Sequence, residues 1–146
     1  MPSFANHVYE QLGGTASFSQ EIGSETEMES AVRGGLPTSV LKQIEIDWKL
    51  TIIELSRTLA IPRTNLMQMM RCSRRMTSAD SDRVYRLVEV LSLAEESVGD
   101  RWRTLAWLRT PNSALGLATP MRAIETEAGR LRVIQSLGAI AYGSVS

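Results

Sequence analysis

Residues 101–143 read RWRTLAWLRTPNSALGLATPMRAIETEAGRLRVIQSLGAIAYG, and this stretch says most about the fold of the chain. Short helical segments alternate in it with residues that end or begin helices. Proline lacks a backbone donor and asparagine favours caps and turns, so Pro111 and Asn112 should end the first segment. The apolar residues of that segment recur at helical spacing and should share one side of a helix: Trp102, Leu105, Ala106 and Leu108.

The second half of the stretch has helix signals of its own. A threonine N-cap followed by proline at the first helical position predicts a new helix at Thr119-Pro120. Thr126 and Gly129 mark a second break, after which a last amphipathic helix should end at Tyr142-Gly143. The apolar face of this helix is predicted to comprise Leu131, Ile134, Leu137 and Ile140. The whole stretch is therefore expected to form a small helical module with a short tail.

Particular residues of this stretch also follow a recognisable order and spacing. They are Ala106-Trp107-Leu108, Pro111-Asn112, Leu115-Gly116, Thr119-Pro120, Thr126, Gly129, Val133, Leu137 and Tyr142-Gly143. In these positions the chain resembles the toxin-binding domain of Xre/MbcA/ParS-type antitoxins. It departs from that family after Gly116, where the family usually has a second glycine and this chain has Leu117.

Two short helices joined by a tight turn are predicted nearer the N-terminus. Thr51 and Glu54 form a capping-box pattern that should begin the first helix, and Ile61-Pro62 should end it. Residues 63–71 should form the second helix. The residues expected on the core side of the pair are Leu55, Leu59, Leu66 and Met69 or Met70, and Met67 and Met76 are also expected to fill the core.

A further helix should precede this pair. Gly34-Gly35-Leu36-Pro37 is typical of a turn, and Thr38 or Ser39 can cap the helix that follows it. The apolar face of that helix should comprise Val40, Leu41, Ile44 and Trp48.

The outer face of residues 63–71 carries side chains that suit DNA. Arginine can bind guanine and asparagine or glutamine can bind adenine with two hydrogen bonds, while further arginines bind phosphates. The candidate DNA-binding residues are Arg63, Thr64, Asn65, Gln68, Arg71, Arg74 and Arg75. The segment resembles Xre-type helix-turn-helix domains, with Pro62 where the family often has a capping serine. A structural helical hairpin that never contacts DNA is the alternative.

Charge is unevenly distributed, although the formal net charge is zero. Residues 1–32 contain five glutamates and no lysine or arginine, whereas residues 57–86 contain seven arginines and two aspartates. A local basic patch attracts a polyanion, which favours the DNA interpretation, although a solvated helical face would have the same composition.

A long helix should begin at Ser78–Asp82, with acidic residues in its first turn, and end at Gly99. Its buried side is expected to comprise Val84, Leu87, Val88, Leu91 and Ala94. The residues Ser81, Asp82, Arg83, Arg86 and Leu87 resemble a segment between the two halves of the antitoxin family, so the resemblance covers about residues 31–143.

The predicted organisation has three parts. Residues 1–30 form an N-terminal segment that is partly disordered, docked, or folded as one or two short helices interrupted at Gly13-Gly14 and Gly23. Residues 31–98 form an Xre-like helix-turn-helix domain, and residues 99–146 form a toxin-binding domain with a short tail. The expected fold class is all-α.

The residues give no sign of an enzyme. The chain has one histidine, His7, and one cysteine, Cys72, and it lacks metal-ligand spacing and phosphate-binding glycine loops. No catalytic site, metal or cofactor is therefore predicted. Without a signal-peptide pattern or a run of about 18 apolar residues, the expected location is the cytoplasm.

The resemblance implies an antitoxin that forms a homodimer, represses its own operon and neutralises a RES-domain toxin that consumes NAD. In that family the C-terminal end blocks the entrance of the toxin's active site. The implied toxin-binding residues are Tyr142, Gly143, Ser144, Val145 and Ser146, with Arg130 and Arg132 either pairing with acidic groups of the toxin or simply solvated. Two alternatives are a free-standing dimeric repressor without a toxin and an adaptor that has lost DNA binding.

Overall fold

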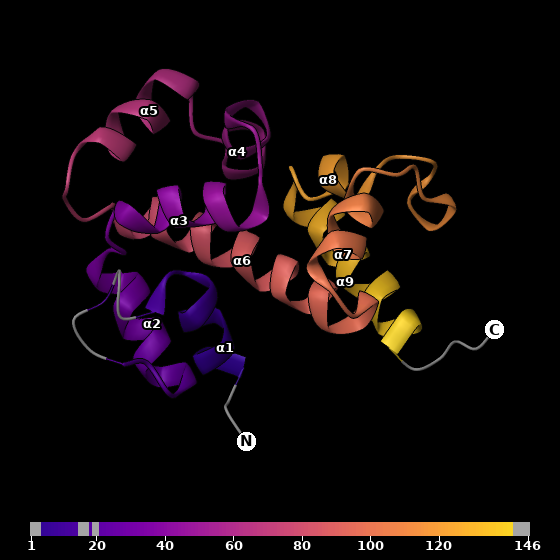
Figure 1. Ribbon diagram of the computed structural model, residues 1–146, viewed down its shortest axis with the longest axis horizontal. Helices are drawn as coiled ribbons and strands as arrows, with labels where there is room; N and C mark the ends of the chain where they lie inside the picture. The colour runs from indigo at the N-terminus through magenta and orange to yellow at the C-terminus, as the bar shows by residue number, and fades with distance from the viewer. Residues whose placement is uncertain (1–3, 15–17, 19–20, 142–146) are drawn as a thin grey trace. The chain divides into compact units, whose positions relative to one another are not determined.

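The computed structural model describes residues 4–14, 18 and 21–141 of the 146-residue chain, and every regular element in these ranges is a helix (Figure 1). The predicted all-α fold is confirmed. The chain divides into two compact units, Met1–Val88 (unit 1) and Glu89–Ser146 (unit 2). The three-part division derived from the sequence stays a prediction. No helix in the described ranges is long and apolar enough to span a membrane.

Unit 1 begins with two helices that contact each other, α1 (Phe4–Gln11) and α2 (Glu25–Gly34). The side chain of Ser24 caps α2 by accepting a hydrogen bond from the amide of Glu27. The predicted interruptions at Gly13-Gly14 and Gly23 lie between the two helices. The apolar side chains buried here are Ala5, Val8, Tyr9, Leu12, Ile22 and Met28.

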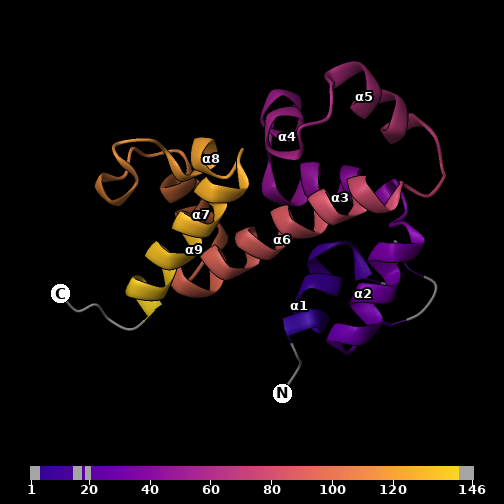
Figure 2. The ribbon, with the colours of Figure 1, turned by 180° about the vertical axis from the view of Figure 1, so that it is seen from behind.

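Three more helices follow in unit 1: α3 (Ser39–Trp48), α4 (Ile52–Leu59) and α5 (Arg63–Arg71). Figures 1 and 2 show α4 and α5 side by side over α3, and α5 contacts both other helices. The capping box is present as predicted, since Thr51 and Glu54 each bind the other's backbone amide at 3.0 Å. The predicted inward residues of the three helices are buried: Val40, Leu41, Ile44, Trp48, Leu55, Leu59, Leu66 and Met69.

The predicted cap of α3 is wrong. Thr38 precedes the helix, but its side chain makes no capping bond, and no cap by Ser39 forms because Ser39 is the first helical residue. The Thr38 hydroxyl instead donates to the carbonyl of Cys72 and accepts from the amide of Arg74. Backbone bonds from Thr38 N to Arg74 O (2.9 Å) and from Met76 N to Leu36 O (2.8 Å) complete the contact. Thr38 therefore fixes the segment that follows α5.

A tight corner at Gly35 adjoins this contact. Gly35 has a φ of 93°, and a Cβ atom there would lie 2.2 Å from the carbonyl oxygen of Met76, so only glycine fits. The next amide, that of Leu36, donates to the buried hydroxyl of Ser81 at 2.8 Å. Ser81 lies in the first turns of α6 (Ser78–Val98). The predicted buried side of α6 is confirmed at Val84, Leu87, Val88, Leu91 and Ala94.

Unit 2 contains the later part of α6 and four short elements: α7 (Arg101–Leu108), the 3-10 helix η2 (Ser113–Leu115), α8 (Pro120–Ala123) and α9 (Glu127–Ala141). α8 contacts both α7 and α9, and α9 also contacts η2. The predicted helix boundaries near Asn112 and Thr119 are confirmed. Asn112 caps η2, and Thr119 caps α8, which has Pro120 at its start. Buried apolar side chains form the core of this unit: Leu105, Leu108, Leu115, Met121, Ile124, Val133 and Leu137.

The predicted buried face of α7 is partly wrong. Leu105 and Leu108 are buried, but Trp102 is 81% exposed and Ala106 is also exposed. Each residue turns a helix by about 100°, so Trp102 points about a quarter turn, and Ala106 more than a quarter turn, away from the direction midway between Leu105 and Leu108. Thr104 is a buried polar residue of α7, and its hydroxyl donates a hydrogen bond to the carbonyl oxygen of Asp100.

The buried face of α9 also differs from its prediction. Val133 and Leu137, one turn apart, are buried, whereas Leu131 is 48% exposed and Ile134 is half-buried. Leu131 precedes Val133 by two residues, which places it on the opposite side of the helix. The side chain of Ile140 and the predicted helix end at Tyr142-Gly143 lie outside the described residues.

Gly129 does not break the helix, contrary to its prediction, because it lies in the first turn of α9. The break falls just before, and the Thr126 hydroxyl accepts a hydrogen bond from the amide of Gly129 at 3.0 Å. A Cβ atom on Gly129 would lie 1.9 Å from the carbonyl oxygen of Ala123, at the end of α8. Gly129 is therefore required by the close approach of α8 and α9.

Candidate functional site

Two buried side chains, Leu66 and Met69, attach α5 to the body of unit 1. The opposite side of the helix is open to solvent, and all five candidate DNA-binding residues of α5 are exposed: Arg63, Thr64, Asn65, Gln68 and Arg71. Pro62 precedes α5 without a side-chain cap, as predicted. Met67, expected in the core, is instead 44% exposed, whereas Met76 is buried. The side chains that suit base recognition are thus on the accessible face of α5.

Arg74 and Arg75 follow α5 and are also exposed. The two differ in their contacts, because the guanidinium of Arg75 donates to the carbonyl oxygen of Gly35 at 3.0 Å. Arg74 contributes its backbone to the contact with Thr38, which leaves its side chain to project from a fixed position. The geometry thus brings Arg74 next to α5, as the DNA interpretation requires.

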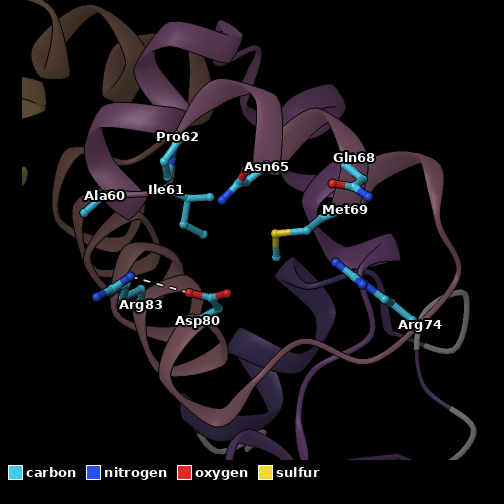
Figure 3. Close-up of a pocket in the computed structure, with 9 residues that line it drawn as sticks. All are labelled: Ala60, Ile61, Pro62, Asn65, Gln68, Met69, Arg74, Asp80 and Arg83. Atoms are coloured by element: carbon cyan, nitrogen blue, oxygen red, sulfur yellow. Dashed lines mark hydrogen bonds and ion pairs between the residues drawn. The ribbon is translucent and has the colours of Figure 1, made fainter.

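A partly open cavity of 380 Å³ lies between α5 and the first turns of α6, and we call it the α5–α6 notch (Figure 3). Asn65 and Met69 extend into it from α5, and Arg74 points toward it from the segment after α5. Asp80 and Arg83 lie on the α6 side, joined by an ion pair of 3.4 Å. The complete lining is Ala60, Ile61, Pro62, Asn65, Gln68, Met69, Arg74, Asp80 and Arg83.

Ion pairs within α6 neutralise part of the basic patch. Arg83 pairs with Asp80, and Arg86 pairs with Asp82 at 2.9 Å. Five other arginines of residues 57–86 have no carboxylate partner in the part of the chain that the structure describes: Arg57, Arg63, Arg71, Arg74 and Arg75. Unpaired positive charge therefore gathers on α4, on α5 and on the segment after it, which is where a polyanion would be attracted.

The two arginines predicted to contact a toxin have different surroundings in α9. Arg130 is only 12% exposed, and its guanidinium contacts Glu127 at 2.7 Å and Glu89 at 2.8 Å. The hydrogen bond that Arg130 donates to Glu127 raises the pKa of the Arg130 guanidinium above its ordinary value, and the bond that it donates to Glu89 acts in the same direction. Arg132 is exposed and donates to the carbonyl oxygen of Ala114 at 3.1 Å. The predicted residues Tyr142 to Ser146 lie outside the described residues.

Unit 2 also exposes large apolar side chains that the sequence did not single out as binding residues. Trp102 projects from the start of α7, which is fixed by the Asp100 cap and by the ion pair between Arg101 and Glu95 at 2.8 Å. Leu117 is 72% exposed and has a φ of 69°, a backbone conformation in which the family's usual glycine would be unstrained. The sequence pattern alone did not reveal Trp102, because Trp102 precedes Leu105 by three residues, a spacing typical of a shared helix face.

The other side chains that could react or bind a metal do not form a site in the described ranges. Cys72 is a free, exposed cysteine, and His7 lies in α1. Among the residues that the structure describes, His, Cys, Asp and Glu side chains do not gather in threes where a metal ion could bind.

Comparison with known proteins gives a family match that falls within unit 2. Residues 93–143 match the family model described as the antitoxin Xre/MbcA/ParS C-terminal toxin-binding domain. An antitoxin Xre from Yersinia enterocolitica is 28% identical over 122 residues, which cover 83% of this chain and 82% of the relative.

Two further relatives bear the same name. An antitoxin Xre from Photorhabdus laumondii is 35% identical over 79 residues, covering 52% of this chain and 53% of the relative. An antitoxin Xre from Pseudomonas putida is 27% identical over 123 residues, covering 84% and 76%. The fold and these matches define an all-α protein that carries a toxin-binding domain. The chain is similar to Xre-type antitoxins over most of its length, and residues 93–143 match the toxin-binding domain of that family.

Proposed function

We propose that unit 2 neutralises a RES-domain toxin that consumes NAD, by placing the C-terminal end of the chain at the entrance of the toxin's active site. The match of residues 93–143 to a toxin-binding domain is the observation that carries this proposal. The type of toxin and the blocking mechanism come from the family resemblance. A steric block needs no catalytic side chain, only a helix that presents the residues after α9 to the toxin.

The proposed contact residues are the tail and one arginine. Tyr142, Gly143 and Ser144-Val145-Ser146 would enter the toxin, and the exposed guanidinium of Arg132 would pair with acidic groups around the entrance. Arg130 has an indirect role in this proposal, because its contacts with Glu127 and Glu89 hold the start of α9 in place.

We also propose that unit 1 binds operator DNA as part of a homodimer and represses the operon. The exposed face of α5 and the unpaired arginines beside it support this proposal. Arg63, Asn65 and Gln68 would contact base edges, while Arg71 and Arg74 would contact phosphates.

Co-purification tests the toxin proposal. Tagged protein isolated from its native host should bring down a stoichiometric partner that consumes NAD after separation and is silenced when this chain is added back. Deleting residues 144–146 should then weaken neutralisation while the two proteins still bind. Unchanged neutralisation would remove the tail from the mechanism, and a partner without NAD-consuming activity would exclude a RES-type toxin.

Alanine substitutions test the DNA proposal. Removing Arg63, Asn65 or Gln68 should reduce discrimination between operator and random DNA by roughly 1–3 kcal/mol per contact. Arg74→Ala should weaken both kinds of binding and reduce the salt dependence. Equal losses on operator and random DNA for the α5 variants would contradict base recognition. A homodimer that brings down only DNA would favour a free-standing repressor, and a chain that binds only the partner would favour an adaptor.

A further inference from the structure

The α5–α6 notch places charged groups of both signs beside the proposed DNA-binding face. Asn65 and Gln68 line it from α5, and the unpaired guanidinium of Arg74 points toward it (Figure 3). Arg83 lines the opposite side, on α6. The guanidinium donors of Arg74 and Arg83, which face the notch from two sides, suit a phosphate group, because a phosphodiester offers two charged oxygens as acceptors.

Asp80 is the acidic residue in this lining, and its position conflicts with such an occupant. Its carboxylate is partly buried and pairs with Arg83 at 3.4 Å, a long contact for an ion pair. A phosphate in the notch would be repelled by Asp80 and attracted by Arg83. In the protein without DNA, the ion pair between Asp80 and Arg83 therefore lowers the affinity of the notch for an anion.

We propose that the α5–α6 notch receives one backbone phosphate of bound DNA, and that Arg83 exchanges the Asp80 carboxylate for this phosphate when DNA binds. This inference rests on the proposed DNA-binding function of unit 1. It adds Arg83 to the phosphate-contacting residues and makes Asp80 a positioning residue that lowers DNA affinity. A phosphate contact carries no sequence information, so both effects apply to operator and random DNA alike.

The chain supplies a matched control for a test of this exchange. Asp82 lies in the same turn of α6 and pairs with Arg86 at 2.9 Å, but it does not line the notch. Asp80→Asn and Asp82→Asn change the net charge equally, and each removes one acidic side chain near the start of α6. A difference between them in DNA binding therefore reports the notch rather than the overall charge.

The measurement is the dissociation constant of the full-length protein for operator and random duplexes at several salt concentrations. Asp80→Asn should bind both duplexes about three- to fivefold more tightly at low salt, as expected for removing a charge about 5 Å from a phosphate in water. Asp82→Asn should change affinity by less than twofold. Arg83→Gln should weaken both complexes and reduce the slope of log affinity against log salt by about 0.9. Urea unfolding of each variant should show that all three remain folded.

The possible outcomes separate this inference from the function on which it rests. Equal affinities for Asp80→Asn and Asp82→Asn, with normal DNA binding by the unaltered protein, would overturn the exchange and leave DNA binding intact. An Arg83→Gln variant with an unchanged salt slope would do the same. Failure of the unaltered protein to bind either duplex would remove both the DNA function and the inference.

Discussion

Two glycines of α9 differ in what surrounds them. A Cβ atom on Gly129 would meet the Ala123 carbonyl oxygen at 1.9 Å, whereas one on Gly138 would have no heavy atom within 4 Å. Gly129→Ala should therefore lower the free energy of unfolding by about 1–3 kcal/mol, because backbone must shift to admit the methyl group. Gly138→Ala should raise it by about 0.5–1 kcal/mol, since alanine loses less entropy in a helix.

Urea unfolding of the two variants measures this difference directly. A Gly129→Ala protein as stable as the unaltered chain would mean that α8 and α9 can separate at no cost. A loss of stability in both variants would instead indicate that α9 tolerates no substitution, whatever its local contacts. The comparison thus isolates the close approach at Gly129 from the general effect of alanine on helices.

At the scale of the element, the N-terminal turn of α7 presents a rigid aromatic side chain. The Asp100 cap and the pair between Arg101 and Glu95 fix this turn, and Trp102 projects from it almost fully exposed. Exposed tryptophans on fixed helices are frequent sources of binding energy at protein interfaces. We therefore expect Trp102 to contact the toxin, in addition to the C-terminal tail.

Trp102→Ser should weaken binding to the toxin by about 2 kcal/mol, or some thirtyfold, with little change in the stability of the free protein. Calorimetric titration of the purified pair measures the affinity. Ala106→Ser, at a second exposed position of the same helix, is the control and should leave the affinity within about twofold. A Trp102→Ser protein that binds as well as this control would exclude α7 from the interface.

Helix limits were predictable from the sequence because local chemistry determines them. The Thr51–Glu54 box, the Thr119-Pro120 start and the Asn112 cap each depend on residues within three positions of one another. The same locality explains why the limits of α5 match their prediction at both ends.

The faces of helices and the partners of polar side chains were less predictable, because distant residues decide them. Trp102 shares a helical spacing with Leu105, yet only Leu105 meets the core of unit 2. Thr38 has the residue type of a cap, but the Cys72–Arg74 segment, more than thirty positions away, takes its hydroxyl. The α5–α6 notch was not predictable from the sequence for the same reason, because Asn65 and Asp80 belong to helices that are separated in sequence.

At the scale of the whole molecule, the two proposed activities reside in different compact units. The combined variant Arg63→Ala, Asn65→Ala and Gln68→Ala should therefore abolish operator recognition while neutralising the toxin as well as the unaltered chain does. Deletion of residues 144–146 should have the opposite effect. Each protein is assayed for operator binding by titration and for suppression of NAD consumption. A single variant that impairs both activities while still folded would show that the units depend on each other.

The three tryptophans of the chain occupy three environments, and they give the molecule a natural optical reporter. Trp48 is fully buried in unit 1, Trp107 is half-buried in unit 2, and Trp102 is open to solvent. A soluble quencher should therefore extinguish the emission of Trp102 first and that of Trp48 last. Toxin that covers α7 would protect Trp102 from the quencher while leaving Trp48 unaffected, so the interface can be located without a label.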